Sequence, residues 1–419
     1  MLALQVAHGQ LPAERPRCPP GFDLSPETRY NTTRISGVNV NFPRRLYFHY
    51  DCEWPVLRTI FILSVTAVLV LGRGLTACGE SFVFVSLLQQ RKIVTFQRHI
   101  DSGGLERRQV TDCPAEPAFM AASSDGRILF VSLRSSGQLA AFRVDPANGN
   151  LSLINVVHGG DDPAFLITDC SGKFLLTAYY IGNKVTVHSV ASDGRLSETP
   201  VQSVTTADNA HGIAIDSANQ AVYVSHTGAN RIDQFRFDPH SGHLTPLDPP
   251  FVEAKTGQHP RHIVLHPSDR WAYCSNEAGD SIEDGASMYT RNEITKSVTL
   301  QQSVSSLPKE FDASRNSTSR CLMTPDGKFL YVANRGHNSI AGFAIHQTSG
   351  QLSRISVTPT EAIPRSFTIT RDGRHLYAAG ESSGRVAGYG ISGNGELSSI
   401  NTIESGPISW AVLAVDTQP

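Results

Sequence analysis

Short apolar segments that end in a small residue recur seven times between residue 81 and the C-terminus. They read FVFVS from Phe82, ILFVS from Ile128, FLLTA from Phe174, AVYVS from Ala221, WAYCS from Trp271, FLYVA from Phe329 and HLYAA from His375. Six of them follow a turn (SDGR, CSGK, SANQ, PSDR, PDGK or RDGR), and successive turns lie 46 to 58 residues apart. Apolar runs between such turns predict strands. A period in this range with several short strands per copy is typical of a β-propeller.

Each copy contains three further segments that resemble strands. One follows the first segment, as in KIVTFQR and QLAAFRV, and another follows a Gly-type turn in most copies, as in GNLSLIN. The last precedes the turn, as in PAFMAAS from Pro117 and PRHIVLH from Pro260. The Asp-Gly and Ser-Gly pairs supply the positive φ angles that tight hairpins need. The pattern therefore predicts blades of four antiparallel strands.

The two ends of the repeat complement each other. The first copy begins at residue 81 without the segment that precedes the turn, whereas PISWAVLAV from Pro407 stands alone at the end of the chain. We expect these ends to form one blade, because ring closure leaves no open sheet edge. The predicted fold class is all-β, a seven-bladed β-propeller over residues 79–419, closed by pairing of its N- and C-terminal strands.

The first 78 residues lie outside the repeat. Residues 1–55 are rich in Pro and Arg without a helix or strand period, and we interpret them as a mis-extended or disordered arm. Residues 56–78 contain Arg58 followed by an apolar run over residues 60–72. That run is shorter than the ~20 residues of a transmembrane helix and fits a signal peptide.

This segment ends in Leu75-Thr76-Ala77-Cys78, which is similar to a bacterial lipobox. The match predicts a lipid on Cys78 and therefore a periplasmic or membrane-anchored lipoprotein. Because a signal peptide starts a chain, Val56 would be the true initiator, read from a GTG codon. The alternative is an N-terminal arm followed by a signal anchor; with a spurious signal, the protein would be cytoplasmic.

Composition and charge exclude some partners. The 419 residues are 40% hydrophobic and 18% charged, with a formal net charge of −2. Nucleic-acid binders are usually basic, and this chain has no run of Lys or Arg, so we expect no nucleic-acid partner. Nothing in the sequence marks a subunit interface, and we expect a monomer.

The cysteines of the repeat do not form a metal motif. Cys113, Cys170, Cys274 and Cys321 lie on or beside strands, without a C-x-x-C pair or a histidine at ligand spacing. Free cysteines usually pack in apolar interiors, so we expect these four to be buried. A Cys113–Cys170 disulfide is an alternative in an exported protein.

Equivalent positions of the innermost strands can be compared around the channel. The residue after the Pro, or its substitute, is Ala118, Ala164, His211, Arg261, Arg320, Arg365 and Ile408 in successive blades. Three consecutive arginines at one level, next to a histidine, predict a functional half of the channel mouth. Such clustered cations repel unless an anion or carboxylate lies among them. The alternative is that these side chains only form hydrogen bonds between blades.

The turn after the next strand reaches the same end of the channel. Asn276 and Glu277 follow WAYCS, Arg335 follows FLYVAN, and Glu381 follows HLYAAG. We expect Glu277 and Arg335 to meet Arg261 and His211 around one pocket. A carboxylate, an imidazole and guanidinium groups suit acyl chemistry, in which a base activates water and arginines hold an oxyanion, carboxylate or phosphate.

Two further histidines, His262 and His266, lie on the Arg261 strand. Alternation of side chains along a strand predicts that His262 faces away from the side that Arg261 occupies. We therefore interpret both as structural histidines.

Several segments resemble the bacterial 6-phosphogluconolactonase family of seven-bladed propellers, over essentially all of residues 80–419. They are GQHPRHIVLHPSDRWAYCSNE, AHGIAID, TPDGKFLYVANR and PRSFTITRDGRHLYAAG. The superfamily includes the fungal carboxy-muconate lactonising enzymes, whose proposed catalytic set falls by motif on His211, Arg261, Glu277 and Arg335. Arg365 matches the later Pro-Arg strand of the family, whereas Arg320 matches no motif residue. We count Arg365, Arg320 and Asn276 as candidate substrate-binding residues.

The resemblance implies hydrolysis of a six-membered sugar lactone, of the 6-phosphoglucono-δ-lactone type, without metal or organic cofactor. His211 or Glu277 would activate water, Arg261 and Arg335 would bind the carbonyl oxygen, and Arg365 with Arg320 would hold an anionic group. A real export signal favours an unphosphorylated aldonolactone in the periplasm instead. The sequence is also compatible with a non-enzymatic binding propeller and with a carboxy-muconate cyclase.

Overall fold

The computed structural model describes residues 31–35, 38–42, 80–278 and 285–418. The chain divides into two compact units, Met1–Gly74 and Leu75–Pro419. In the first unit, β1 (Asn31–Ile35) and β2 (Val38–Phe42) pair as an antiparallel two-stranded sheet, which the sequence pattern did not predict. The proposed signal segment and Cys78 lie outside the described residues.

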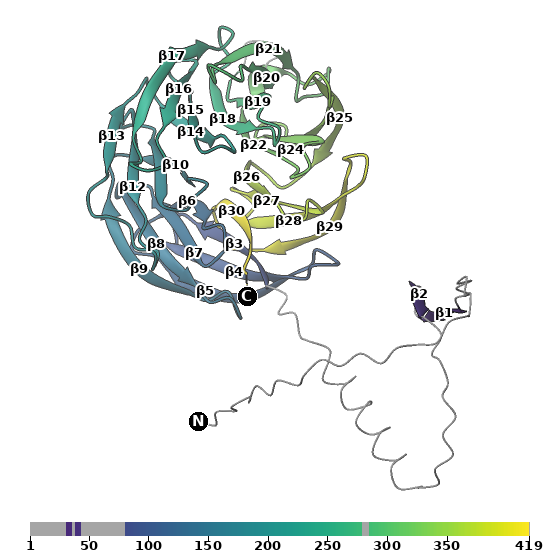
Figure 1. Ribbon diagram of the computed structural model, residues 1–419. Helices are drawn as coiled ribbons and strands as arrows, with labels where there is room; N and C mark the ends of the chain where they lie inside the picture. Colours follow the sequence, from purple (N-terminus) through teal and green to yellow (C-terminus); the bar gives the residue numbers. More distant parts are fainter. Residues whose placement is uncertain (1–30, 36–37, 43–79, 279–284, 419) are drawn as a thin grey trace, which may run out of the picture. The chain divides into compact units, whose positions relative to one another are not determined.

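The second unit is a ring of seven four-stranded antiparallel sheets, as Figure 1 shows. Blade 1 contains β30 (Ser409–Asp416), β3 (Ser81–Leu87), β4 (Lys92–Arg98) and β5 (Leu105–Asp112). Blade 2 contains β6 (Pro117–Ala122), β7 (Ile128–Leu133), β8 (Gln138–Val144) and β9 (Leu151–His158). Blade 3 contains β10 (Pro163–Thr168), β11 (Phe174–Tyr179), β12 (Lys184–Ser189) and β13 (Gln202–Thr205).

The remaining blades repeat this order. Blade 4 contains β14 (Ala210–Ile215), β15 (Ala221–His226), β16 (Arg231–Phe237) and β17 (Leu244–Glu253). Blade 5 contains β18 (Pro260–Leu265), β19 (Trp271–Asn276), β20 (Ala286–Arg291) and β21 (Val298–Val304). After the 3-10 helix η2 (Ala313–Arg315), blade 6 contains β22 (Thr318–Met323), β23 (Phe329–Asn334), β24 (Ser339–Ile345) and β25 (Leu352–Pro359). Blade 7 contains β26 (Pro364–Ile369), β27 (His375–Gly380), β28 (Arg385–Ile391) and β29 (Leu397–Glu404).

The predicted closure of the ring is confirmed. The C-terminal β30 pairs antiparallel with β3, from Ser81 opposite Asp416 to Leu87 opposite Ser409. It therefore supplies the inner strand that the first copy of the repeat lacks. The all-β, seven-bladed fold class is confirmed with it.

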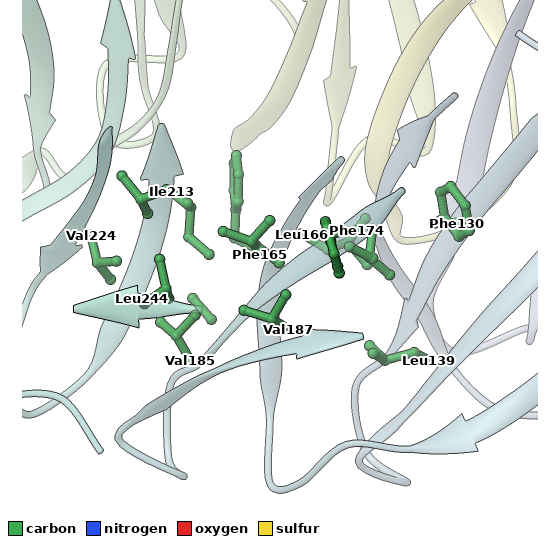
Figure 2. Packing of buried hydrophobic residues seen from close by; sticks show 14 of the residues in the cluster. Phe130, Leu139, Phe165, Leu166, Phe174, Val185, Val187, Ile213, Val224 and Leu244 are labelled. Carbon is green, nitrogen blue, oxygen red and sulfur yellow. The ribbon is translucent and has the colours of Figure 1, made fainter. Parts of the chain in front are cut away.

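The core lies between blades, which pack face to face. Strands such as β7 and β11 are buried along their whole length, and Figure 2 shows Phe165, Leu166, Val185 and Ile213 of consecutive blades packed together. Burial on both faces accounts for the continuous apolar runs in the sequence. A repeated polar contact joins neighbouring blades: the hydroxyl of Tyr331 donates to the carbonyl of Gly395 at 2.8 Å, and Tyr273 and Tyr377 make the equivalent bonds to Gly350 and Gly103.

A β-bulge interrupts the pairing of each inner strand near its first residue. In β18, Pro260 pairs with Asn276 and His262 with Ser275, so Arg261 is an extra residue without a partner in the ladder. The same irregularity occurs in the other six inner strands. A bulge changes the direction of neighbouring side chains, and these seven bulges lie together at one end of the channel.

The cysteines differ in part from expectation. Cys113, Cys274 and Cys321 are buried, whereas Cys170 is exposed, and all four are free, so the alternative Cys113–Cys170 disulfide is wrong. Within the described residues, no group of three or more His, Cys, Asp or Glu side chains is placed to hold a metal ion. The same residues include no helix with the length and hydropathy of a membrane span.

The closing blade has a polar cluster whose loss should reduce stability. The buried Arg98 contacts Asp416 at 3.4 Å and Asp372 at 3.3 Å, and the Ser81 hydroxyl donates to Asp416 at 2.5 Å. Asp416→Ala leaves Arg98 and Ser81 with fewer partners, so we expect a loss of about 2 kcal/mol in the free energy of unfolding. Chemical denaturation would measure this loss.

The matched control for that measurement is Asp112→Ala. Asp112 forms an exposed ion pair with Lys92, and such surface pairs contribute about 1 kcal/mol or less. Equal effects of the two substitutions would contradict a stabilising role of the Arg98 cluster.

Candidate active site

The extra residues of the seven bulges form one level at the mouth of the channel. The strand registers place there Ala118, Ala164, His211, Arg261, Ser319, Arg365 and Trp410. Equivalent hydrogen bonds between neighbouring blades confirm this alignment. Ser225 Oγ of blade 4 donates to Arg261 O, and Ser275 Oγ of blade 5 donates to Ser319 O, both at 2.7 Å. The structure thus brings His211, Arg261 and Arg365 to one level, as predicted.

Two positions in the predicted level are wrong. Arg320 lies one residue further along β22, because Ser319 occupies the place of Arg261. Trp410, not Ile408, completes the level in β30. Ile408 has a positive φ of 56°, like Ile363 at 54°, and both precede their inner strands.

The next residues along the inner strands close the channel below this level. Phe119 lies 4.3 Å from Phe165 between ring centroids, Phe165 lies 5.3 Å from His262, and Arg320 Cζ lies 4.6 Å from the Phe119 ring. Phe119 and Arg320 belong to blades 2 and 6, which are not neighbours, so their contact spans the channel. We call Phe119, Phe165, His262 and Arg320 the floor.

The floor overturns the expectation for His262. Its ring lies 5.0 Å from that of His211, and both side chains line the same cavity as Arg261. Strict alternation failed because the bulge at Arg261 shifts the following residue to the channel side. His266, in contrast, bonds to Ser268 and to the carbonyl of Gly327 and packs against Trp271, as a structural histidine does.

Glu277 joins two arginines at the mouth. Its Oε1 lies 2.6 Å from Arg335 Nη2 and 3.3 Å from Arg261 Nε. Arg335 is held further by the carbonyl of Thr318 and the hydroxyl of Ser317. The Arg261 contact is an ion pair without hydrogen-bond alignment, and Nε and Nη1 of Arg261 are buried with no hydrogen-bond partner among the described residues. Arg335 is therefore fixed, whereas Arg261 retains free donors.

A second set of charges surrounds Trp410. Arg365 stacks on the Trp410 ring at 3.7 Å and donates to Glu381 Oε2 at 3.1 Å. Arg134 lies 5.4 Å from the same ring and donates to Asp162 Oδ2 at 2.8 Å. Each of these two guanidinium groups thus contacts one carboxylate and the ring of Trp410. These contacts reduce the repulsion between the two cations.

Two hollows meet at Arg365. The inner cavity, about 20 Å³, is lined by Phe119, Arg134, Ala164, His211, Arg261, His262, Arg365, Ser366, Trp410 and Ala411. That volume has room for about one water molecule. The outer cleft, about 680 Å³, is lined by Glu277, Ser314, Arg315, Asn316, Ser317, Arg335, Gly336, Ile363, Arg365 and Glu381.

The two candidate bases differ in charge. Burial, and then the positive charge of Arg261, hold the pKa of His211 well below its usual range, so its imidazole is neutral near pH 7. Its Nδ1 has no hydrogen-bond partner among the described residues. For Glu277, burial raises the pKa, but Arg261 and Arg335 together outweigh burial, so the pKa is lowered and the carboxylate is ionised.

Comparison with known proteins decides the family. The family model described as "Lactonase, 7-bladed beta-propeller" matches residues 83–413. The chain belongs to this lactonase family. Two relatives are named 6-phosphogluconolactonase: that of Serratia proteamaculans (strain 568) is 29% identical over 290 residues, and that of Xenorhabdus nematophila 30% over 290 residues. Each alignment covers 69% of this chain and 85% of the relative.

A solved structure shows the same fold. The periplasmic gluconolactonase of Pseudomonas aeruginosa superimposes with a TM-score of 0.73 at 22% identity. The match covers 81% of this chain and 100% of that protein. At this identity the likeness establishes the shared propeller fold alone.

One predicted site residue of this lactonase-family chain does not reach the channel. The side chain of Asn276 donates to Ser287 Oγ at 2.9 Å inside blade 5. Asn334, at the equivalent position of blade 6, donates to Ser339 Oγ of its own blade and to Ser306 O of the preceding connection. The structure therefore places Asn276 in the scaffold rather than in the cleft.

Three residues at the site were not identified from the sequence: Arg134, Tyr180 and Trp410. Arg134 directly follows ILFVSL as Glu277 follows WAYCSN, so the register of the repeat was sufficient to identify it. Tyr180 follows FLLTAY in the same way, and its ring packs edge-on against His211 at 5.8 Å. Trp410 required the register of the last strand, after which the repeat has no further turn to serve as a marker.

Arg335→Met should raise the pKa of Glu277. The substitution removes one of the two cations that lower this pKa, while burial continues to raise it, so we expect an upward shift. The ionised carboxylate contributes to the free energy of unfolding, and this contribution is lost as pH falls through the folded-state pKa. In the variant the loss therefore begins at higher pH. A ¹³C NMR titration of glutamate carboxyl groups would measure the shift, with Glu277→Gln to assign the signal.

Arg236→Met is the control for this titration, because Arg236 is exposed on β16, outside both hollows. An unchanged Glu277 titration in Arg335→Met would show that the ion pair does not set the charge of the carboxylate.

Proposed function

We propose that this lactonase-family propeller hydrolyses a sugar-acid lactone of the 6-phosphoglucono-δ-lactone type at the mouth of its channel. The observation that carries the proposal is the pairing of a neutral His211 with an under-bonded Arg261 in one small cavity, beside the ionised Glu277. A neutral base and free cationic donors in a buried space are what addition of water to an ester carbonyl requires.

Arg261 is the proposed oxyanion donor. Its Nε and Nη1 lack hydrogen-bond partners among the described residues, although the side chain is buried. An unsatisfied buried donor carries a desolvation cost, and the negative oxygen of a tetrahedral intermediate would remove that cost. Arg261 therefore forms stronger hydrogen bonds in the transition state than before the reaction, and this difference lowers the reaction barrier.

His211 is the proposed base, in preference to Glu277. Oε1 of Glu277 already accepts a hydrogen bond from Arg335 and forms an ion pair with Arg261, and both contacts weaken it as a base. The inner cavity has room for one water beside His211. The water oxygen attacks the lactone carbonyl carbon while its proton passes to His211; the ring C–O bond then breaks, and the released oxygen takes the proton from His211.

The positive charges of the surrounding arginines disfavour protonation of His211, but the negative oxygen of the tetrahedral intermediate offsets this repulsion. Proton transfer forms the imidazolium and the negative tetrahedral oxygen together, so the net charge of the site does not change. Glu277 fixes Arg261 at the edge of the cavity and supplies the carboxylate that cationic side chains at this density need.

The neutral aldonolactone is the second candidate substrate. Glu277 and Glu381 pair with Arg335 and Arg365 in the outer cleft, which reduces its positive potential and favours an uncharged sugar. With this substrate we propose a periplasmic protein that carries a lipid on Cys78. The ring-closing reaction on a carboxy-muconate would use the same residues with a more negative substrate.

Alanine at His211, Arg261 or Glu277 should each lower kcat by about 10²-fold or more, because each removes a base, an oxyanion donor or the group that positions it. The assay is lactone hydrolysis at pH 7, and thermal unfolding would verify that each variant folds. Arg236→Ala is expected to retain wild-type turnover. Full activity in all three site variants would overturn the assignment.

A pH-stat assay with glucono-δ-lactone and its 6-phosphate, corrected for spontaneous opening, tests the reaction itself. We expect acid release above background with preference for the phosphorylated lactone, because Arg315, Arg335 and Arg365 line the cleft. Preference for the neutral lactone would favour the second candidate, and no rate above background on either would favour a binding propeller.

A further inference from the structure

One connection between blades is much longer than the others. From the end of each outer strand to the next inner strand, the connections contain four residues in five cases (113–116, 159–162, 206–209, 360–363 and 405–408) and six in one case (254–259). The connection from β21 to β22 contains thirteen residues, 305–317. Relative to the four-residue connections, it adds nine residues to the 58-residue spacing between two turns of the repeat, whose shortest spacing is 46.

This connection is anchored to the active-site side of the ring. The Asn316 side chain donates to Asn334 Oδ1 at 3.1 Å and accepts the backbone N–H groups of Gly336 and His337. The Ser317 hydroxyl donates to the carbonyl of Glu277 at 2.8 Å. These bonds fix the end of the connection to both turns that carry the Glu277–Arg335 pair.

Gly336 permits the close approach. A Cβ atom there would lie 1.9 Å from the carbonyl oxygen of Arg315, a distance that no side chain allows. The position of Arg315 over the cleft therefore depends on the absence of a side chain at residue 336.

Arg315 differs from the other arginines of the outer cleft. Arg335 pairs with Glu277, and Arg365 pairs with Glu381. Within the described residues no carboxylate lies within ion-pair distance of Arg315. Its guanidinium lies 5.9 Å from the Phe311 ring, and, after the hydrogen bonds from Ser314, its positive charge helps to lower the pKa of the exposed Asp312. Among the described residues of the cleft, Arg315 is thus the exposed arginine whose guanidinium is not held in an ion pair with a carboxylate.

We propose that Arg315 binds the anionic group, phosphate in the first instance, that the substrate carries away from its lactone ring. The proposal rests on the proposed function, and it assigns the choice between a phosphorylated and a neutral lactone to the 305–317 connection. A guanidinium binds phosphate through two parallel N–H donors. Arg365, which lines both hollows, remains beside the ring of the bound sugar.

The test compares Arg315→Ala with wild type in the full chain on glucono-δ-lactone and its 6-phosphate. We expect KM for the phosphorylated lactone to rise about tenfold, with KM and kcat for the neutral lactone unchanged. Arg315 is exposed on a connection, so the substitution should not affect folding. Arg236→Ala removes an exposed arginine elsewhere and should change neither substrate.

Binding of the products separates this proposal from the proposed function. Calorimetry with 6-phosphogluconate and gluconate should show tighter binding of the phosphorylated acid to wild type, and loss of that preference in Arg315→Ala. An equal affinity of wild type for both acids, or a preference that survives the substitution, overturns the role of Arg315 even if both lactones are hydrolysed. Absence of hydrolysis with the expected binding would overturn the enzymatic function alone.

Discussion

The inner strands of this propeller do not keep the two-residue period of a regular strand at their first residues. A bulge inserts one unpaired residue in each, so in blade 5 two consecutive side chains, Arg261 and His262, line the same cavity. The first of the two belongs to the level that contains His211 and Arg261, and the second belongs to the floor that contains His262 and Arg320. The bulge therefore places His211 and Arg261 on the inner cavity, and the side chains that follow meet across the channel beneath them, as Arg320 does over Phe119.

This closure has an electrostatic consequence. Groups that face a closed, narrow space lose water, and charge among them is costly unless it is paired. Arg134, Arg335 and Arg365 each have a carboxylate partner in hydrogen-bond contact, whereas Arg261 shares Glu277 without alignment. His211 responds to the same surroundings by remaining neutral. The mouth thus combines fixed ion pairs with His211 Nδ1 and the Nε and Nη1 donors of Arg261, which have no hydrogen-bond partner in the part of the chain that the structure describes.

The repeat in the sequence was sufficient to predict the architecture, because each blade contains the same strands and turns and the two ends complement each other. It also placed His211, Arg261 and Arg365 at one level. The errors arose where the repeat gives no second marker. Arg320 entered the predicted level because Ser319 was taken as the substitute for the proline, whereas Thr318 occupies the place of Pro260. His262 was assigned by an alternation that the bulge interrupts. Contacts across the channel, such as Arg320 over Phe119, depend on ring curvature, which no single repeat contains.

Seven similar blades produce a nearly symmetric scaffold, so chemistry requires departures from symmetry. Inside the channel the departures are single side chains at equivalent positions, for example Ala164 in blade 3 and Arg261 in blade 5. Outside it the departure is one long connection, 305–317, held against blade 6 by Asn316 and admitted by the missing side chain of Gly336. Changes of the first kind alter the side chains that line the inner cavity. Changes of the second kind alter the wall of the outer cleft and leave the residues of the bulge level as they are.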